Sequence, residues 1–210
     1  MSLSSASPRT HRRIPVQDRS ERRVASMLAQ AAAVIAEVGY EAATMTEIAA
    51  RSKASIGSLY QYFPNKEAIT TALRQQYVRE LEERWTSLES QVDQLSPASL
   101  GERIVTLFVE FAEERPAFIP MLSAPLRVRS DPAARHRLRE NFARLFRRKN
   151  PALSPAESLS VAQVTLQTIK GLHTLAGETR PSDAKAVVAE FGTLLGAYLE
   201  RRLTPAAVHA

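Results

Sequence analysis

The chain has no cysteine, and only one tryptophan and seven glycines stand among its 210 residues. Without a thiol it can form no disulfide, no thiolate-bound metal site and no cysteine nucleophile. Its four histidines are scattered along the sequence, and it shows neither a glycine-rich phosphate loop nor a metal-ligand spacing. The sequence therefore argues against an enzyme and predicts no catalytic residue, no metal site and no cofactor.

Long apolar runs are also missing. No stretch approaches the ~18 apolar residues that a membrane-spanning helix needs. The first residues are basic and rich in serine, with no apolar segment before Ile14, so they do not read as a secretory signal. We therefore expect a cytoplasmic protein with no membrane partner.

No segment alternates apolar and polar residues as a half-buried strand does. Helical periodicity instead covers most of the chain from Glu21 onward, and prolines mark nearly every junction. The predicted fold is all-α with about nine helices. The expected helices run from Glu21 to a cap at Gly39, from Thr44 to near Ser52, from Ile56 to Phe63, and from just after Asn65 to about Gln91, followed by Ser99–Glu114, a broken segment Pro116–Arg127, Pro132–Arg148, Pro155–Ala176 and Ser182–Leu203.

Positive charge is what the sequence has in excess. The formal net charge is +6 and the isoelectric point about 10.0, which favours polyanionic partners. Residues 1–23 hold six arginines against Asp18 and Glu21. Residues 1–20 lack apolar periodicity, so we predict a flexible basic arm there. Two interpretations stay open, a solvated disordered tail or an arm that enters the DNA minor groove.

Residues 21–66 carry the layout of a helix-turn-helix. Three helices follow one another, and the last two are short and joined by four residues. Thr44-Met45-Thr46-Glu47 is a capping box, in which the threonine hydroxyl accepts from the third helical amide and the glutamate reaches back. Pro64 stops the third helix and Asn65 caps the fourth. We predict a DNA-binding domain over residues 21–66.

The third helix has a polar and small-residue face. Leu59 and Phe63 are the expected core side, whereas Gly57, costly within a helix, suits close approach of the backbone to DNA. Gln61 can pair with a base edge, and tyrosine hydroxyls and a lysine at a helix start suit phosphates. The predicted DNA-contacting residues are Thr44, Thr46, Ser55, Gly57, Ser58, Tyr60, Gln61, Tyr62 and Lys66.

Two segments carry a family resemblance. The sequences GYEAATMTEIA, from Gly39 to Ala49, and SIGSLYQYFPNKE, from Ser55 to Glu67, resemble the DNA-binding domain of the tetracycline-repressor (TetR) family. The match covers about residues 22–70. Ile56 departs from it, because several relatives carry a polar or basic contact residue there. An aliphatic side chain at this position either touches a thymine methyl or simply packs.

The resemblance implies a homodimer formed through the last two long helices. It also implies that residues 67–210 bind a small-molecule effector and dimerise. The expected function is a repressor that an effector releases from a palindromic operator in double-stranded DNA. The alternatives are a dimeric helix-turn-helix protein without small-molecule induction, and an activator. Nothing in the sequence identifies the effector.

Several residues beyond the helix-turn-helix have two readings each. Residues of this kind are more often ordinary core, but they are also the candidates for a ligand pocket: Trp85, Phe108, Phe111, Met121, Gln167 and His173. Gly192 and Gly196 permit close helix approach, as a dimer seam would use. The basic run from Arg135 to Lys149 is either a solvated helix face or a contact for an anionic effector or DNA.

Overall fold

The computed structural model describes residues 16–122, 132–178 and 180–205. These residues form nine α-helices, one 3-10 turn and no strand, which confirms the all-α prediction. The helices are α1 (Val16–Ala42), α2 (Met45–Arg51), α3 (Ile56–Tyr62), α4 (Lys66–Gln91), the 3-10 turn η1 (Val92–Gln94), α5 (Pro97–Glu114), α6 (Phe118–Leu122), α8 (Pro132–Lys149), α9 (Pro155–Glu178) and α10 (Pro181–Leu203).

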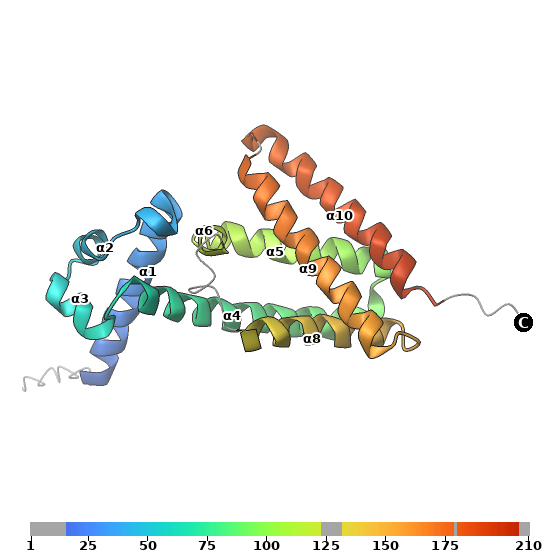
Figure 1. Cartoon of the computed structure of the whole chain (residues 1–210), viewed down its shortest axis with the longest axis horizontal. Coiled ribbons are helices and arrows are strands. Elements are labelled where there is room, and N and C mark those ends of the chain that lie inside the picture. Colours follow the sequence, from blue (N-terminus) through green and yellow to red (C-terminus); the bar gives the residue numbers. More distant parts are fainter. Residues whose placement is uncertain (1–15, 123–131, 179, 206–210) are drawn as a thin grey trace, which may run out of the picture.

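Figure 1 shows two parts joined by one long helix. Helices α1, α2 and α3 form a small unit at one end of the molecule, and α4 leads from it into a larger helical part. There α5 packs along α10, and α8 packs on α9. Helix α6 returns to contact α1, so the larger part touches the smaller one at a second place.

Most helices begin and end within two residues of the prediction, with two differences. Helix α1 begins at Val16, inside the segment predicted as a flexible arm, while residues 1–15 of that arm lie outside the described residues. The segment predicted over Pro116–Arg127 contains the short helix α6, and its remainder from residue 123 lies outside the described part. Gly39 does interrupt α1, with φ 79°.

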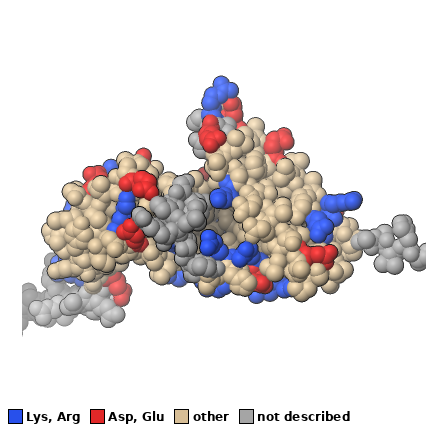
Figure 2. All heavy atoms as spheres, in the orientation of Figure 1, with Lys and Arg blue, Asp and Glu red and all other residues tan. Residues whose placement is uncertain are grey.

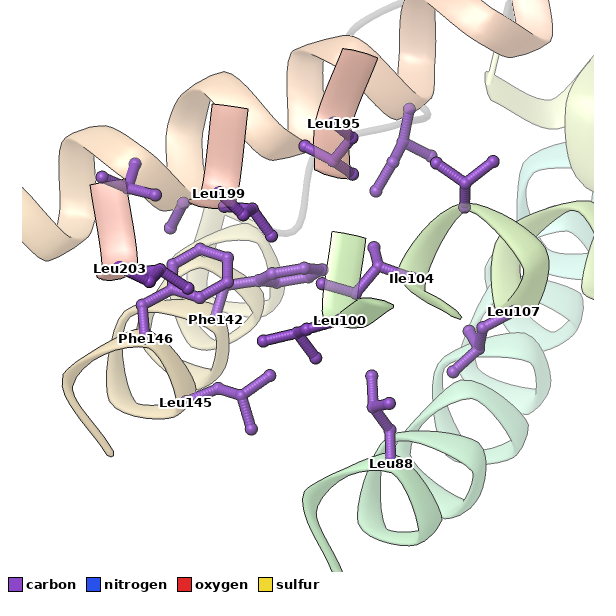
Figure 3. Packing of buried hydrophobic residues seen from close by; sticks show 14 of the residues in the cluster. Leu88, Leu100, Ile104, Leu107, Phe142, Leu145, Phe146, Leu195, Leu199 and Leu203 are labelled. Carbon is purple, nitrogen blue, oxygen red and sulfur yellow. The ribbon is translucent and has the colours of Figure 1, made fainter. Parts of the chain in front are cut away.

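Two apolar cores share α4. The first core joins α1, α2 and α3 to the first half of α4, through Ile69, Leu73 and Tyr77, and takes in Phe111 and Met121. The second core, part of which Figure 3 shows, contains Trp85 and Leu88 of α4 with side chains from α5, α8, α9 and α10. The packing of the small N-terminal unit therefore extends past Lys66, along about three turns of α4.

Glycines bring α5 and α10 into close contact. A Cβ atom built on Gly101 would lie 2.6 Å from the backbone nitrogen of Gly196, and one on Gly196 would lie 3.0 Å from the carbonyl oxygen of Ala98. The close approach expected of Gly196 in a dimer seam is thus made within the chain, against α5.

Candidate nucleic-acid interface

The start of α2 is fixed by Thr44. Its hydroxyl accepts from the amide of Glu47 at 3.2 Å, the first half of the predicted capping box. In the second half of that box the Glu47 carboxylate would accept from the Thr44 amide. The carboxylate instead accepts from Arg51 Nε at 2.7 Å. Thr44 and Thr46 are both exposed at this end of the helix.

Arg51 ties α2 to α1. Besides Glu47, its guanidinium donates to the Glu37 carboxylate at 2.6 Å. The hydrogen bond from Arg51 holds the pKa of Glu37 below its ordinary value, so the ion pair stays formed at neutral pH. This pair could not be predicted from the sequence, since residues 14 positions apart on different helices give no spacing signal.

The turn between α2 and α3 closes through backbone bonds. Lys53 has φ 52°, and its amide donates to the carbonyl of Ala50 at 3.1 Å, while the Ala54 amide donates to Ala49 at 3.0 Å. This pair of bonds, with a left-handed residue after the helix cap, is a Schellman motif. It turns the chain sharply, which lets α3 leave α2 at an angle.

Helix α3 is amphipathic over two turns. Ser55 caps its start by accepting from the Ser58 amide at 3.1 Å. Leu59 and Phe63 are buried in the first core, as predicted, whereas Ile56 and Tyr60 are exposed large side chains. A helix held by one apolar edge presents its other face outward, and that is the requirement for insertion into a major groove.

The predicted DNA-contacting residues divide into two groups. Seven of them are not buried in a core. One of the seven is Gly57, where an added Cβ atom would meet nothing within 4 Å. These seven are Thr44, Thr46, Ser55, Gly57, Ser58, Tyr60 and Gln61. The other two, Tyr62 and Lys66, are half-buried, and their side chains contact α1.

Tyr62 and Lys66 both connect α3 and α4 back to α1. The Tyr62 hydroxyl lies 3.3 Å from the hydroxyl of Ser20. The Lys66 ammonium donates to the carbonyls of Tyr40, at 2.7 Å, and Glu41, at 3.0 Å, and sits 4.5 Å from the centre of the Tyr40 ring. Lys66 therefore caps the end of α1, where free carbonyls attract a cation.

The candidate pocket residues lie in two aromatic groups. Trp85 and Phe108 both pack near Phe142, with ring centres 4.3 Å and 6.4 Å away. Phe111 packs edge-to-face with Phe118 at 5.0 Å, and Phe118 does the same with His173 at 6.1 Å.

The remaining two candidates fall differently. Met121 is buried in the first core, which also contains Phe111, whereas Gln167 is exposed on α9, away from the others. His173 is buried, and desolvation lowers its pKa, so the imidazole is neutral at pH 7. Thr165 of α9, which the sequence analysis did not select, is fully buried.

Comparison with protein families decides what these two parts are. Residues 27–73 match the family described as "Bacterial regulatory proteins, tetR family". Residues 96–199 match the one described as "Tetracyclin repressor-like, C-terminal domain". The chain belongs to the TetR family. It is a transcriptional regulator of that family, and the two matches fall on the two parts seen in Figure 1.

Solved structures share the TetR fold over most of the chain. A TetR-family transcriptional regulator from Pectobacterium atrosepticum is 22% identical, with a TM-score of 0.65, over 91% of this chain and 99% of its own. FadR from Bacillus subtilis, in complex with stearoyl-CoA, is 17% identical with a TM-score of 0.62, over 86% and 97% of the two chains. SmeT in complex with triclosan is 20% identical with a TM-score of 0.67, over 90% and 95%. No curated protein matches the sequence.

The basic run of this TetR-family regulator is used largely for contacts within the chain. Arg148 pairs with Asp93, Lys149 donates to the carbonyl of Leu95 at 2.6 Å, and Arg139 lies 3.4 Å from the side-chain oxygen of Gln163. Figure 2 shows basic and acidic side chains close together along the edge where Figure 1 draws α4 and α8. In the described residues, no helix has the length and apolarity that crossing a membrane requires.

Proposed function

We propose that this TetR-family regulator is a repressor that binds a palindromic operator as a homodimer and is released by a small-molecule effector. The observation that carries DNA binding is the outward face of α3. Gly57 is open to solvent there, and the exposed residues Tyr60 and Gln61 lie one turn further along the same short helix. A surface with a bare backbone segment and hydrogen-bonding side chains around it suits base edges and phosphates.

The outer side of α9 and α10 supports the homodimer. Val164 on α9 and Leu194 on α10 expose 44% and 56% of their area, although both stand on helices whose inner faces are buried. The two helices are adjacent, since a Cβ atom on Gly171 would lie 3.9 Å from the ring of Phe191. Apolar side chains on neighbouring helices are what a symmetric four-helix interface needs.

The aromatic contacts support control by an effector. Phe118 of α6 packs against Tyr77 of the first core, with ring centres 6.3 Å apart, and against His173 of α9. Occupation of the larger part can therefore shift α6 and α4, and an effector that favours the shifted arrangement lowers DNA affinity by its difference in binding free energy. The relatives FadR and SmeT are complexes with stearoyl-CoA and triclosan, so this fold accommodates small molecules.

The experiment is footprinting on the DNA upstream of the regulator's own gene, where we expect two protected half-sites one helical turn apart, about 34–36 Å. Gln61→Ala should weaken binding about 5- to 150-fold, because a bidentate base contact contributes about 1–3 kcal/mol. Gln75→Ala is the matched control, since Gln75 is exposed on α4, and its affinity should not change.

A complex with no preference for this DNA over random sequence would contradict specific recognition. An activator would instead raise transcription from the same site, which a reporter assay distinguishes. We expect the protein to act in the cytoplasm, where its DNA is.

A further inference from the structure

Three buried polar side chains of the described residues have hydrogen-bond partners. The Thr70 hydroxyl donates to the carbonyl of Lys66 at 2.8 Å, and the Ser158 hydroxyl donates to that of Pro155 at 2.9 Å. The side-chain amide of Asn150 lies 3.4 Å from the carbonyl of Arg202, and its oxygen accepts from the Ala152 amide at 3.1 Å. This is the ordinary state of a folded interior, because an unpaired buried polar group costs free energy.

Three other buried side chains depart from that state. Trp85 Nε1, Thr165 Oγ1 and His173 Nε2 have no hydrogen-bond partner among the described residues, although each side chain belongs to a residue that is at most 7% exposed. Thr165 is the informative case. Other helical threonines donate to the carbonyl four residues earlier; these include Thr70, Thr86, Thr106, Thr168, Thr174 and Thr193.

Two of the three groups lie on one helix, and the third belongs to a core to which that helix contributes. Thr165 and His173 lie on the same buried face of α9, with buried Ile169 between them. Eight residues of α-helix separate them by about 12 Å. Trp85 comes from α4 and belongs to the same apolar core as Ile169.

The side chains that pack against two of these groups are aromatic and uncharged. Trp85 packs against Phe142, and His173 against the edge of Phe118. No Asp, Glu, Lys or Arg residue is buried as a whole in the described part of the chain, and the buried Nη2 atom of Arg74 belongs to a residue three turns before Trp85 on α4. The indole N–H can only donate, and the hydroxyl can donate too. A group bound here is therefore one that accepts hydrogen bonds and carries no charge, since a buried charge without a counter-charge is costly.

We propose that Trp85, Thr165 and His173 bind the effector, and that the effector is an elongated, largely apolar, uncharged molecule with hydrogen-bond-accepting oxygens near both ends. This inference rests on the proposed control by a small molecule. The proposed site narrows the class of effector. Organic cations, and molecules whose charged group would have to be buried there, are excluded.

A matched pair of probes tests the ligand class. 4,4′-Dimethoxystilbene and 4,4′-diethylstilbene have the same shape, but only the first has acceptor oxygens at both ends. In equilibrium dialysis with the full chain, the dimethoxy compound should bind at least about tenfold more tightly, since one hydrogen bond contributes about that factor. Thr165→Val and His173→Phe should each reduce its affinity about tenfold and leave that of the diethyl compound unchanged. Equal affinities, or no binding of the dimethoxy compound, would overturn the proposal.

A second measurement needs no ligand. Thr165→Val removes an unpaired buried hydroxyl at nearly constant volume, so it should raise the Tm of the free protein. Ser158→Ala removes a paired hydroxyl and should lower the Tm. A lower Tm for Thr165→Val would show that the hydroxyl already has a partner, which contradicts the proposal.

Operator binding by the same variants separates this inference from the proposed function. Thr165→Val without ligand should bind operator DNA as the unchanged protein does, since Thr165 lies on α9, which contributes no residue to the core that holds α3. If the unchanged protein bound the dimethoxy probe selectively but no operator, the ligand proposal would stand and the repressor proposal would fall.

Discussion

In the DNA-binding unit, the side chain of Lys66 has a structural role besides the predicted contact with DNA. Lys66 was predicted to contact phosphate from the start of α4, yet two of the three N–H bonds of its ammonium are directed at the carbonyls of Tyr40 and Glu41. The group also lies over the Tyr40 ring, which stabilises a cation. We therefore expect Lys66 to act on DNA binding mainly by holding α1 against α4.

Lys66→Met separates the two duties. The variant keeps the apolar stem but loses the hydrogen bonds, so the Tm should fall by about 2–8 °C, the shift expected for about 1–2 kcal/mol in a chain of this size. The slope of log affinity for operator DNA against log salt should stay unchanged. A slope smaller by about one per lost phosphate contact would show that Lys66 binds phosphate directly.

Some of the residues that cap or join the helices could be predicted from the sequence, and others could not. Thr44, Ser55 and Asn65 could be predicted as caps, because their hydroxyl or amide oxygens stand at helix starts in a known pattern. The left-handed Lys53 could not, since glycine or asparagine is the usual signal at that position. The partners of Arg51 depend on how α1 and α2 pack, which no local pattern contains.

At the scale of elements, helix ends could largely be predicted, because prolines and caps determine them. The start of α1 could not. Its first residues lack apolar periodicity, but adding a residue to an existing helix gains a hydrogen bond at little cost, so the helix extends beyond its buried part. The pairing of α5 with α10 was also missed, since glycines on two distant helices indicate closeness only once the partner is known.

Gly101→Ala tests that pairing. The new methyl would lie 2.6 Å from the backbone of Gly196, and backbone cannot move aside as a side-chain end does. We expect a loss of about 1–3 kcal/mol of stability, measured by thermal or denaturant unfolding.

Gly171→Ala is the control for this substitution. Its Cβ would meet only the ring of Phe191 at 3.9 Å, so stability should be unchanged or slightly higher, since alanine favours a helix. Equal destabilisation by both substitutions would show that helix packing at Gly101 is looser than described.

For the whole molecule, the sequence predicts a DNA-binding domain over residues 21–66 followed by a larger helical domain, and this division stays a prediction. The first core continues through Leu73 and Tyr77, so the packing boundary falls within α4 rather than at its first residue. Amphipathic patterns locate buried faces, but they do not say which partner covers each face. The same limit applies to the pocket residues, of which Gln167 is exposed on α9 whereas Trp85, Phe108 and His173 are buried.

Dimerisation is the property of the whole molecule most open to test. Leu194→Glu places a charge on the exposed outer side of α10, and analytical ultracentrifugation should show a shift from dimer to monomer, because burying an unpaired charge is costly. Operator affinity should fall with it, since one monomer reaches a single half-site.

Thr193→Glu, on the neighbouring exposed position of the same helix, is the control and should remain dimeric. A monomeric unchanged protein, or a dimeric Leu194→Glu protein, would mean that another surface joins the two copies.

The buried position of Trp85 gives the larger part an optical signal of its own. The chain contains one tryptophan, and that indole lies in the second core beside Phe142, remote in sequence from α3. All tryptophan fluorescence therefore originates from a single water-shielded site on the helix that both parts share. A change in emission when operator DNA is added would report rearrangement at the other end of α4, without any label attached to the protein.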